Sequence, residues 1–246
     1  HRRGEGGRVR IIAVIALREL ASYFRAPIGW VVVAAFVFVS GLTVAFTTLR
    51  PGEPATMRDF FALSHWLLLM IAPAISMRLF SEEIRSGTIE PLMTAPVSDW
   101  QTALGKYLGG VLFLLVMLAP TLGHVALLEW VADPDYGPIL AGYCGLLLVG
   151  VLYLAVGLVM SSLTANQMAA YLGTLFFFLV LLFATSQGAR LAGPPWDSYL
   201  MAAAPGARID DFARGVIDTR HAVFFLGISA FFVVLGVVSL ESRRWR

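Results

Sequence analysis

The sequence predicts an all-α, polytopic membrane protein with six transmembrane helices. Only 14% of the 246 residues are charged and 58% are hydrophobic, whereas a soluble domain carries about 25% charged residues. Long stretches lack charge altogether, and a helix needs about 20 apolar residues to cross a hydrocarbon core of about 30 Å. A net charge of +2 is too small to suggest a nucleic-acid partner. A single cysteine excludes a disulfide framework or a cysteine-based metal centre within one chain.

The first predicted element is an N-terminal interfacial amphipathic helix over residues 8–27. Placed at 100° per residue, one half of this helix carries Arg8, Arg10, Arg18, Glu19, Ser22 and Arg25. The other half carries Val9, Ala13, Ala16, Leu17, Leu20 and Phe24. We expect it to lie in the membrane interface, with Arg10, Arg18 and Arg25 near anionic lipid head groups. The alternative is that these arginines merely flank the first span.

Stretches with little or no charge predict six spans, which cover about 28–49, 60–78, 104–128, 138–162, 167–186 and 222–240. The interval from Asp135 to Arg190 has no charge and is too long for one helix. Its polar centre, SSLTANQ at 161–167, predicts a tight hairpin of two spans. Six spans place both termini on one side. Because most basic residues lie on that side, we expect both termini to be cytoplasmic, in a bacterial cytoplasmic (inner) membrane.

The predicted cytoplasmic segment 79–103 is dense in polar residues for this chain. Gly87 is expected to end a helix that continues from the second span, and Thr88 to cap a short helix with Glu90 in its first turn. Pro96 would end that helix, and Ser98 with Gln101 predicts a capping box for the third span. A short helix under the membrane is typical of a surface that contacts another protein. The alternative is a solvated turn.

The predicted extracytoplasmic segment 187–221 is the longest on its side. Gly193, Pro194 and Pro195 break it, whereas Ile209, Phe212 and Val216 recur at helical spacing. We therefore expect outer helices that lie before the last span.

The chemistry that the spans lack excludes several classes of protein. The spans contain two histidines away from their ends, His65 and His124, and no carboxylate lies in the middle of a span. We interpret both histidines as hydrogen-bond partners between helices, with a proton relay, and hence an ion-coupled carrier, as the disfavoured alternative. The chain has no G-x-x-x-x-G-K-[ST], H-E-x-x-H or G-x-S-x-G motif. We therefore expect no catalytic site and no metal site, and any work must come from a partner.

Four stretches resemble the ABC-2 family of ATP-binding-cassette permeases, in particular its gliding-motility and nitrous-oxide-reductase-maturation branch. They are LRELASYFRAPIGWVVVAAFVFVSGL (17–42), RLFSEEIRSGTIEPLMTAPVSDWQTALGK (78–106), SSLTANQ (161–167) and FARGVIDTRHAVFFL (212–226) with the terminal SLESRRWR. The resemblance implies two ABC ATPase subunits, which bind ATP and Mg, and a second permease subunit that is identical or related. It leaves room for a periplasmic-domain protein as a further partner.

The resemblance also implies site residues. A cytoplasmic coupling helix that docks on the ATPase would include Glu82, Glu83, Arg85, Gly87, Thr88, Glu90, Leu92 and Met93. A second coupling turn would include Ser161, Ser162, Thr164, Asn166 and Gln167. The N-terminal helix resembles the family's connecting helix. The second and fifth spans would line the path of an exported substrate that is lipid-like, amphipathic or polymeric. The alternative function is a non-transporting membrane anchor of a motility or envelope complex.

Overall fold

The computed structural model describes residues 2–48, 56–88 and 97–243, and its regular elements within these ranges are all helices. Six of its helical segments are long and apolar enough to cross a membrane. They are Pro27–Thr48, Arg58–Ser86, Asp99–Val131, Tyr136–Leu163, Gln167–Ala192 and Thr219–Ser242. The predicted all-α class and the six spans are therefore confirmed, and the chain is a multi-pass membrane protein.

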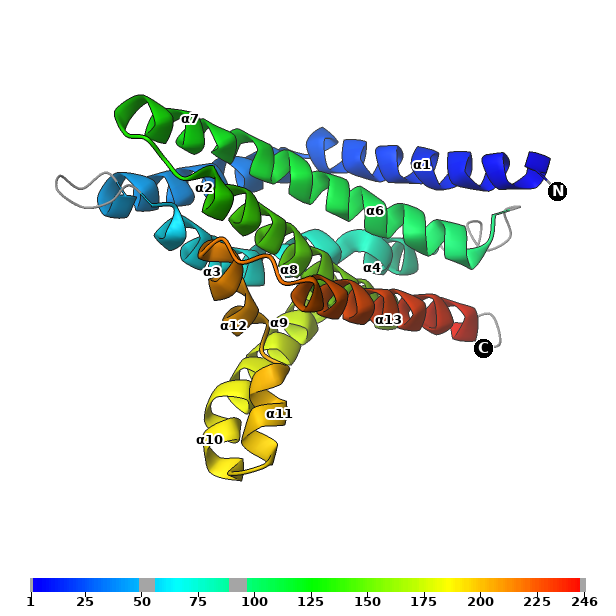
Figure 1. Ribbon diagram of the computed structural model, residues 1–246. Coiled ribbons are helices and arrows are strands. Elements are labelled where there is room, and N and C mark those ends of the chain that lie inside the picture. Colours follow the sequence, from blue (N-terminus) through cyan, green and yellow to red (C-terminus); the bar gives the residue numbers. More distant parts are fainter. Residues whose placement is uncertain (1, 49–55, 89–96, 244–246) are drawn as a thin grey trace.

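The N-terminal helix α1 (Arg2–Arg25) precedes the first span and lies beside the start of the third (Figure 1). Ala26 is extended and Pro27 stands at the first position of α2 (Pro27–Thr43), where its missing N–H costs no hydrogen bond. A π-helical turn, η1 (Val44–Thr48), completes this span. The helix predicted at 8–27 thus forms and begins earlier, whereas its position in the membrane interface stays a prediction.

The second span consists of α3 (Arg58–Ser76) and α4 (Arg78–Ser86), joined at Met77. Gly87 ends α4 with φ +70°, a left-handed conformation that glycine adopts without a steric penalty. The sequence predicted this end. The helix therefore occupies the first part of the segment predicted as the loop 79–103.

The third span begins with α6 (Asp99–Leu118), whose first turn has the predicted capping box. The Ser98 hydroxyl accepts a hydrogen bond from the Gln101 N–H, and the Gln101 side chain accepts one from the Ser98 N–H. A 3₁₀ turn, η2 (Ala119–Thr121), contains Pro120 and leads into α7 (Leu122–Val131).

Helix α8 (Tyr136–Leu163) is the centre of the bundle and packs against α3, α6, α12 and α13. Its glycines allow this close packing: a Cβ at Gly150 would lie 2.4 Å from Leu114 Cδ2 of α6. Helix α9 (Gln167–Phe183) follows after a three-residue turn and is capped by the Asn166 side chain. The hairpin predicted within the uncharged interval is therefore present.

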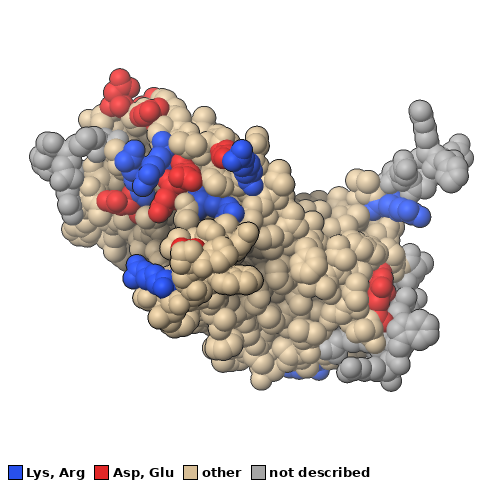
Figure 2. Space-filling model, turned by 60° about the horizontal axis from the view of Figure 1, so that its bottom comes forward, with Lys and Arg blue, Asp and Glu red and all other residues tan. Residues whose placement is uncertain are grey.

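The remaining elements are the π-helical turn η3 (Ala184–Gly188), α10 (Ala189–Ala192), α11 (Trp196–Ala202), α12 (Pro205–Ala213) and α13 (Thr219–Arg243). Helices α10 and α11 form a tip at the far end of α9, away from the bundle (Figure 1). Figure 2 shows charged side chains toward the two ends of one face, with a broad uncharged surface between them. Large apolar side chains such as Phe176 and Val223 are exposed, as expected where lipid covers the protein.

Candidate functional site

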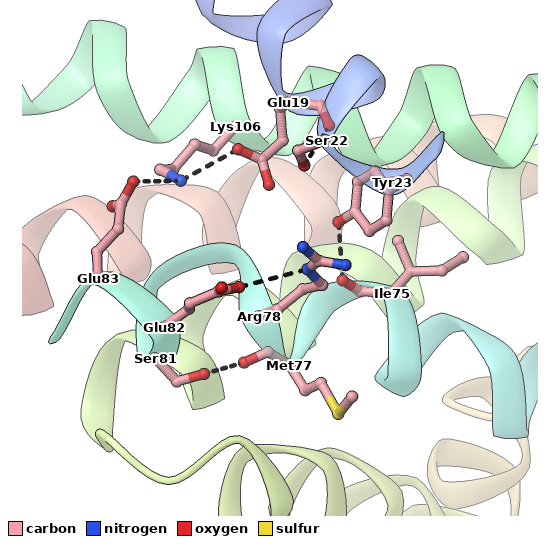
Figure 3. Close-up of polar contacts among 10 residues, drawn as sticks. All are labelled: Glu19, Ser22, Tyr23, Ile75, Met77, Arg78, Ser81, Glu82, Glu83 and Lys106. Atoms are coloured by element: carbon pink, nitrogen blue, oxygen red, sulfur yellow. Dashed lines mark hydrogen bonds and ion pairs between the residues drawn. The ribbon is translucent and has the colours of Figure 1, made fainter. Parts of the chain in front are cut away.

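At the end of the bundle where α4 finishes, charged side chains from three helices meet around Lys106 (Figure 3). The Lys106 Nζ atom lies 3.1 Å from Glu19 Oε2 of α1 and 2.9 Å from Glu83 Oε1 of α4. Only 3% of the lysine side chain is exposed. We call Glu19, Glu83 and Lys106 the Lys106 cluster. It joins the predicted coupling segment to both α1 and α6.

The Lys106 cluster is stable only as a unit, because a buried charge is costly without a partner. One ammonium group compensates two carboxylates, and it also lies 5.5 Å from the centre of the Phe80 ring. The second carboxylate oxygen of Glu83, Oε2, is buried and has no hydrogen-bond partner. Removing the lysine would therefore leave two uncompensated carboxylates close together.

Beside the cluster, Arg78 connects α1 with the junction of α3 and α4. Its guanidinium group lies 5.1 Å from the centre of the Tyr23 ring and its Nε atom lies 3.6 Å from Glu82 Oε2. The Tyr23 hydroxyl donates a 2.8 Å hydrogen bond to the Ile75 carbonyl. Burial, together with the nearby Glu19 carboxylate, raises the pKa of the Tyr23 phenol well above its ordinary value. The phenol therefore stays protonated and remains the donor. Ser81 donates to the Met77 carbonyl across the same junction.

Two glycines of α6 bring α1 close enough to form the cluster. A Cβ at Gly105 would lie 2.6 Å from Ile15 Cβ, and one at Gly109 would lie 2.5 Å from Glu19 Cβ. The motif Gly105–Gly109 permits close helix approach because neither residue has a side chain. Here the motif forms the contact with α1.

The structure corrects the placement of Glu19, which was expected on the polar half of the N-terminal helix. It also shows the surroundings of Lys106, which lies near the start of the span predicted at 104–128. Both are buried, because α6 covers the face of α1 that carries Ala16, Glu19 and Tyr23. Periodicity within one helix does not show which neighbour will cover it. A signal was present, since Lys106 is the chain's one lysine and lies between Gly105 and Gly109.

The residues of the predicted coupling helix have different surroundings. Glu83 belongs to the Lys106 cluster and Glu82 pairs with Arg78, whereas Arg85 is exposed. Gly87 and Thr88 follow α4, and the Thr88 hydroxyl lies 2.8 Å from that of Ser86. Glu90, Leu92 and Met93 lie outside the described residues. An open cleft of about 620 Å³ adjoins the cluster and is lined by Arg18, Arg25 and Thr88 among others.

The predicted second coupling turn is only partly accessible. Ser161 and Ser162 are buried and donate to the carbonyls of Leu158 and Val159. Thr164 and Asn166 shape the turn, since the Thr164 hydroxyl accepts from the Asn166 N–H.

The two predicted coupling segments lie at the same end of the bundle. Gln167, the first residue of α9, and Arg85 of α4 line one cavity of about 290 Å³. Arg10, Arg18 and Arg25 are exposed. Their contact with lipid, like the coupling role of both segments, stays a prediction.

The expected role of the two histidines as hydrogen-bond partners between helices stays a prediction. The Nδ1 atoms of His65 and His124 are buried without a hydrogen-bond partner, so neither forms the expected bond between helices at this atom. Their rings lie near aromatic rings: the ring centres of His65 and Tyr153 are 6.0 Å apart, and those of His124 and Phe60 are 5.8 Å apart. Among the described residues no group of three or more His, Cys, Asp or Glu side chains could hold a metal ion.

Six spans, a buried charged cluster at one end of the bundle and a helix that ends there at Gly87 define a polytopic membrane protein. The model of the ABC-2 family transporter proteins matches residues 53–244, and the chain therefore belongs to this family. The sequence is also 32% identical over 186 residues to the "Probable ABC transporter permease protein NosY" of Pseudomonas aeruginosa. That alignment covers 70% of this chain and 68% of the relative.

Proposed function

We propose that the chain is the permease subunit of an ATP-driven exporter, and that separate ATPase subunits dock where α4 ends. Family membership and the similarity to a permease protein support the transporter class. In this proposal two ATPase subunits bind ATP and Mg, and two permease subunits form the membrane part. The termini lie in the cytoplasm, and the membrane is the bacterial inner membrane.

The observation that carries the proposal is the connection between α4 and the rest of the bundle. Glu83 of α4 shares the Lys106 ammonium with Glu19 of α1. A displacement of the segment after Gly87 would therefore move α1, α4 and α6 together rather than bend one loop. A network of ion pairs between packed helices is one means of coupling a docking surface to membrane helices.

The structure also indicates which residue tests the docking site. Glu83 is a poor choice, because its replacement would disturb the buried cluster. Arg85 is exposed on the same helix, so Arg85→Glu reverses a charge at the docking surface without opening the core. Arg220→Glu makes the same change at an exposed residue at the start of α13 and serves as the matched control.

The experiment compares both variants with the wild type after co-expression with the ATPase encoded beside this gene. We expect Arg85→Glu to reduce co-purification of the ATPase about tenfold or more, as for removal of a charged interface partner. ATPase stimulation should fall with it, whereas Arg220→Glu should behave as wild type. Equal co-purification and stimulation in all three proteins would show that the ATPase docks elsewhere. A different result would favour the alternative function, a non-transporting membrane anchor. In that case the ATPase docks normally, but no lipid or glycan extract changes the rate of ATP hydrolysis.

A further inference from the structure

A small cavity of about 150 Å³ lies between α3, α8, α9 and the start of α12. One wall is aromatic and is formed by Trp66, Tyr153 and Phe178. Tyr153 and Phe178 are buried with ring centres 4.3 Å apart, whereas Trp66 is 48% exposed. Leu182, 39% exposed, lies on the α9 side. The cavity therefore has an apolar wall and an apolar mouth on the outer surface of the bundle.

The other wall is the N-terminus of α12, which lacks a cap. Ala204 stands at the capping position, where it offers no side-chain acceptor, and Pro205 has no N–H. The first N–H groups of a helix have no partner within it. The donors left at this wall are therefore the N–H groups of Gly206 and Ala207, both of which line the cavity.

A second, independent observation points to a missing ligand. His65 lines the same cavity and is 9% exposed; its buried Nδ1 atom has no hydrogen-bond partner, and its Nε2 atom is the one that faces α12. A Cβ at Gly206 would lie 3.5 Å from His65 Nε2, so the imidazole ring lies directly against the start of α12. Thr185 and Ser186 also line the cavity, but their hydroxyls donate to the Leu182 carbonyl. Toward a ligand, these two hydroxyls can therefore accept a hydrogen bond but not donate one.

The charge around this helix start favours an anion. The first turn of α12 has no acidic residue, although the positive end of a helix dipole normally attracts one. Arg208 adds a positive charge close by: its guanidinium group donates to the Ala204 carbonyl at 3.2 Å and lies 3.5 Å from the centre of the Phe224 ring. Its Nε atom is buried without a partner. The nearby carboxylate, Asp210, is exposed and lies further along the helix.

We propose that this cavity binds an anionic amphiphile, with its carboxylate or similar oxyanion at the α12 N-terminus and its apolar body against the aromatic wall. The N–H groups of Gly206 and Ala207 hold the anion, as helix N-termini do for carboxylates and phosphates. The body of the ligand leaves through the mouth beside Trp66 and Leu182 toward the lipid. This assignment concerns binding alone and does not depend on docking of an ATPase.

The decisive variant is Ala204→Asp. An aspartate at this position caps the helix with its own carboxylate, so it occupies the donors that the ligand needs while it stabilises α12. Loss of binding together with an unchanged or higher unfolding temperature therefore cannot result from misfolding. Ile217→Asp adds the same charge at an exposed residue after α12 and serves as the matched control. His65→Leu removes the polar group of the facing wall.

The test measures binding of radiolabelled decanoate to the chain in phosphatidylcholine nanodiscs, with decanol and acetate as competitors. We expect saturable binding that Ala204→Asp weakens about tenfold or more, that His65→Leu weakens, and that Ile217→Asp leaves unchanged. Equal binding by wild type and Ala204→Asp would overturn the proposal. Competition by decanol as strong as that by unlabelled decanoate would show a purely apolar site. Equally strong competition by acetate would show a site for small anions. Either result would also overturn the proposal.

Discussion

At the scale of single residues, the cluster around Lys106 is the feature that most constrains the molecule. A lysine with 3% of its side chain exposed and two carboxylates within 3.1 Å exchanges hydration for two ion pairs. Such an arrangement adds little stability compared with an apolar core, but breaking it is expensive. Its value lies in specificity, since three helices must be in register before the charges are compensated.

We predict that Lys106→Met lowers the free energy of unfolding by about 3–5 kcal/mol, because it leaves Glu19 and Glu83 buried without a cation. The triple variant Glu19→Gln, Lys106→Met, Glu83→Gln should recover most of this loss, since it removes all three charges. Unfolding of the purified protein in detergent measures both effects. The matched control is Glu82→Gln, which breaks the pair of Arg78 with a side chain that is 49% exposed and should cost about 1 kcal/mol or less. A loss for Lys106→Met no larger than this control would contradict a role for the cluster in stability.

At the scale of elements, the close contact between α1 and α6 depends on two glycines of α6, which have no side chain. Gly105 and Gly109 face Ile15 and Glu19 at distances that no Cβ would tolerate. Without this close approach, Glu19 could not reach Lys106, and α4 would lose its connection to α1. The packing of one helix pair thus determines whether the charged cluster exists.

We predict that Gly109→Ala destabilises the protein by about 1–3 kcal/mol, as overpacking does, because its Cβ would lie 2.5 Å from Glu19 Cβ. Gly123→Ala is the matched control, since a Cβ there meets nothing within 4 Å. An alanine in place of this helical glycine should be neutral or should stabilise by up to about 1 kcal/mol. Thermal unfolding of the two variants in the same detergent gives the comparison. Similar unfolding temperatures would mean that α1 does not pack closely on α6 in solution.

The sequence was sufficient for features that are coded locally. Gly87 and the pair Ser98 and Gln101 mark helix ends by their own chemistry, and the uncharged interval before Arg190 required a hairpin on length alone. Burial of Glu19 and Lys106 could not be predicted this way, because it depends on which helix packs against which. The cavity at α12 was missed for the same reason, since His65 and Gly206 are 141 positions apart and meet only in the folded bundle.

At the scale of the whole molecule, the structure has two chemically different regions. The Lys106 cluster, Gly87 and the turn before Gln167 lie at one end of the bundle, and the cavity at α12 lies beside the middle of α3. Helices α3, α4, α6 and α12 all pack on α8, which therefore contacts elements of both regions. The two proposals are nevertheless separable, since docking is measured with the ATPase and binding is measured without it.

Orientation in the membrane gives the last prediction. The excess of arginine at both termini and in the α4 region favours the cytoplasmic side for these segments. In a Cys144→Ser background, we expect a membrane-impermeant maleimide to label Asp133→Cys and Arg214→Cys on intact cells, because both positions are exposed at the opposite end. Ser86→Cys and Ser242→Cys, also exposed, should react only after permeabilisation. Labelling of all four in permeabilised membranes is the control for reactivity. The reverse pattern on intact cells would place α4 outside, out of reach of an ATPase in the cytoplasm, and would therefore refute the docking proposal together with the orientation.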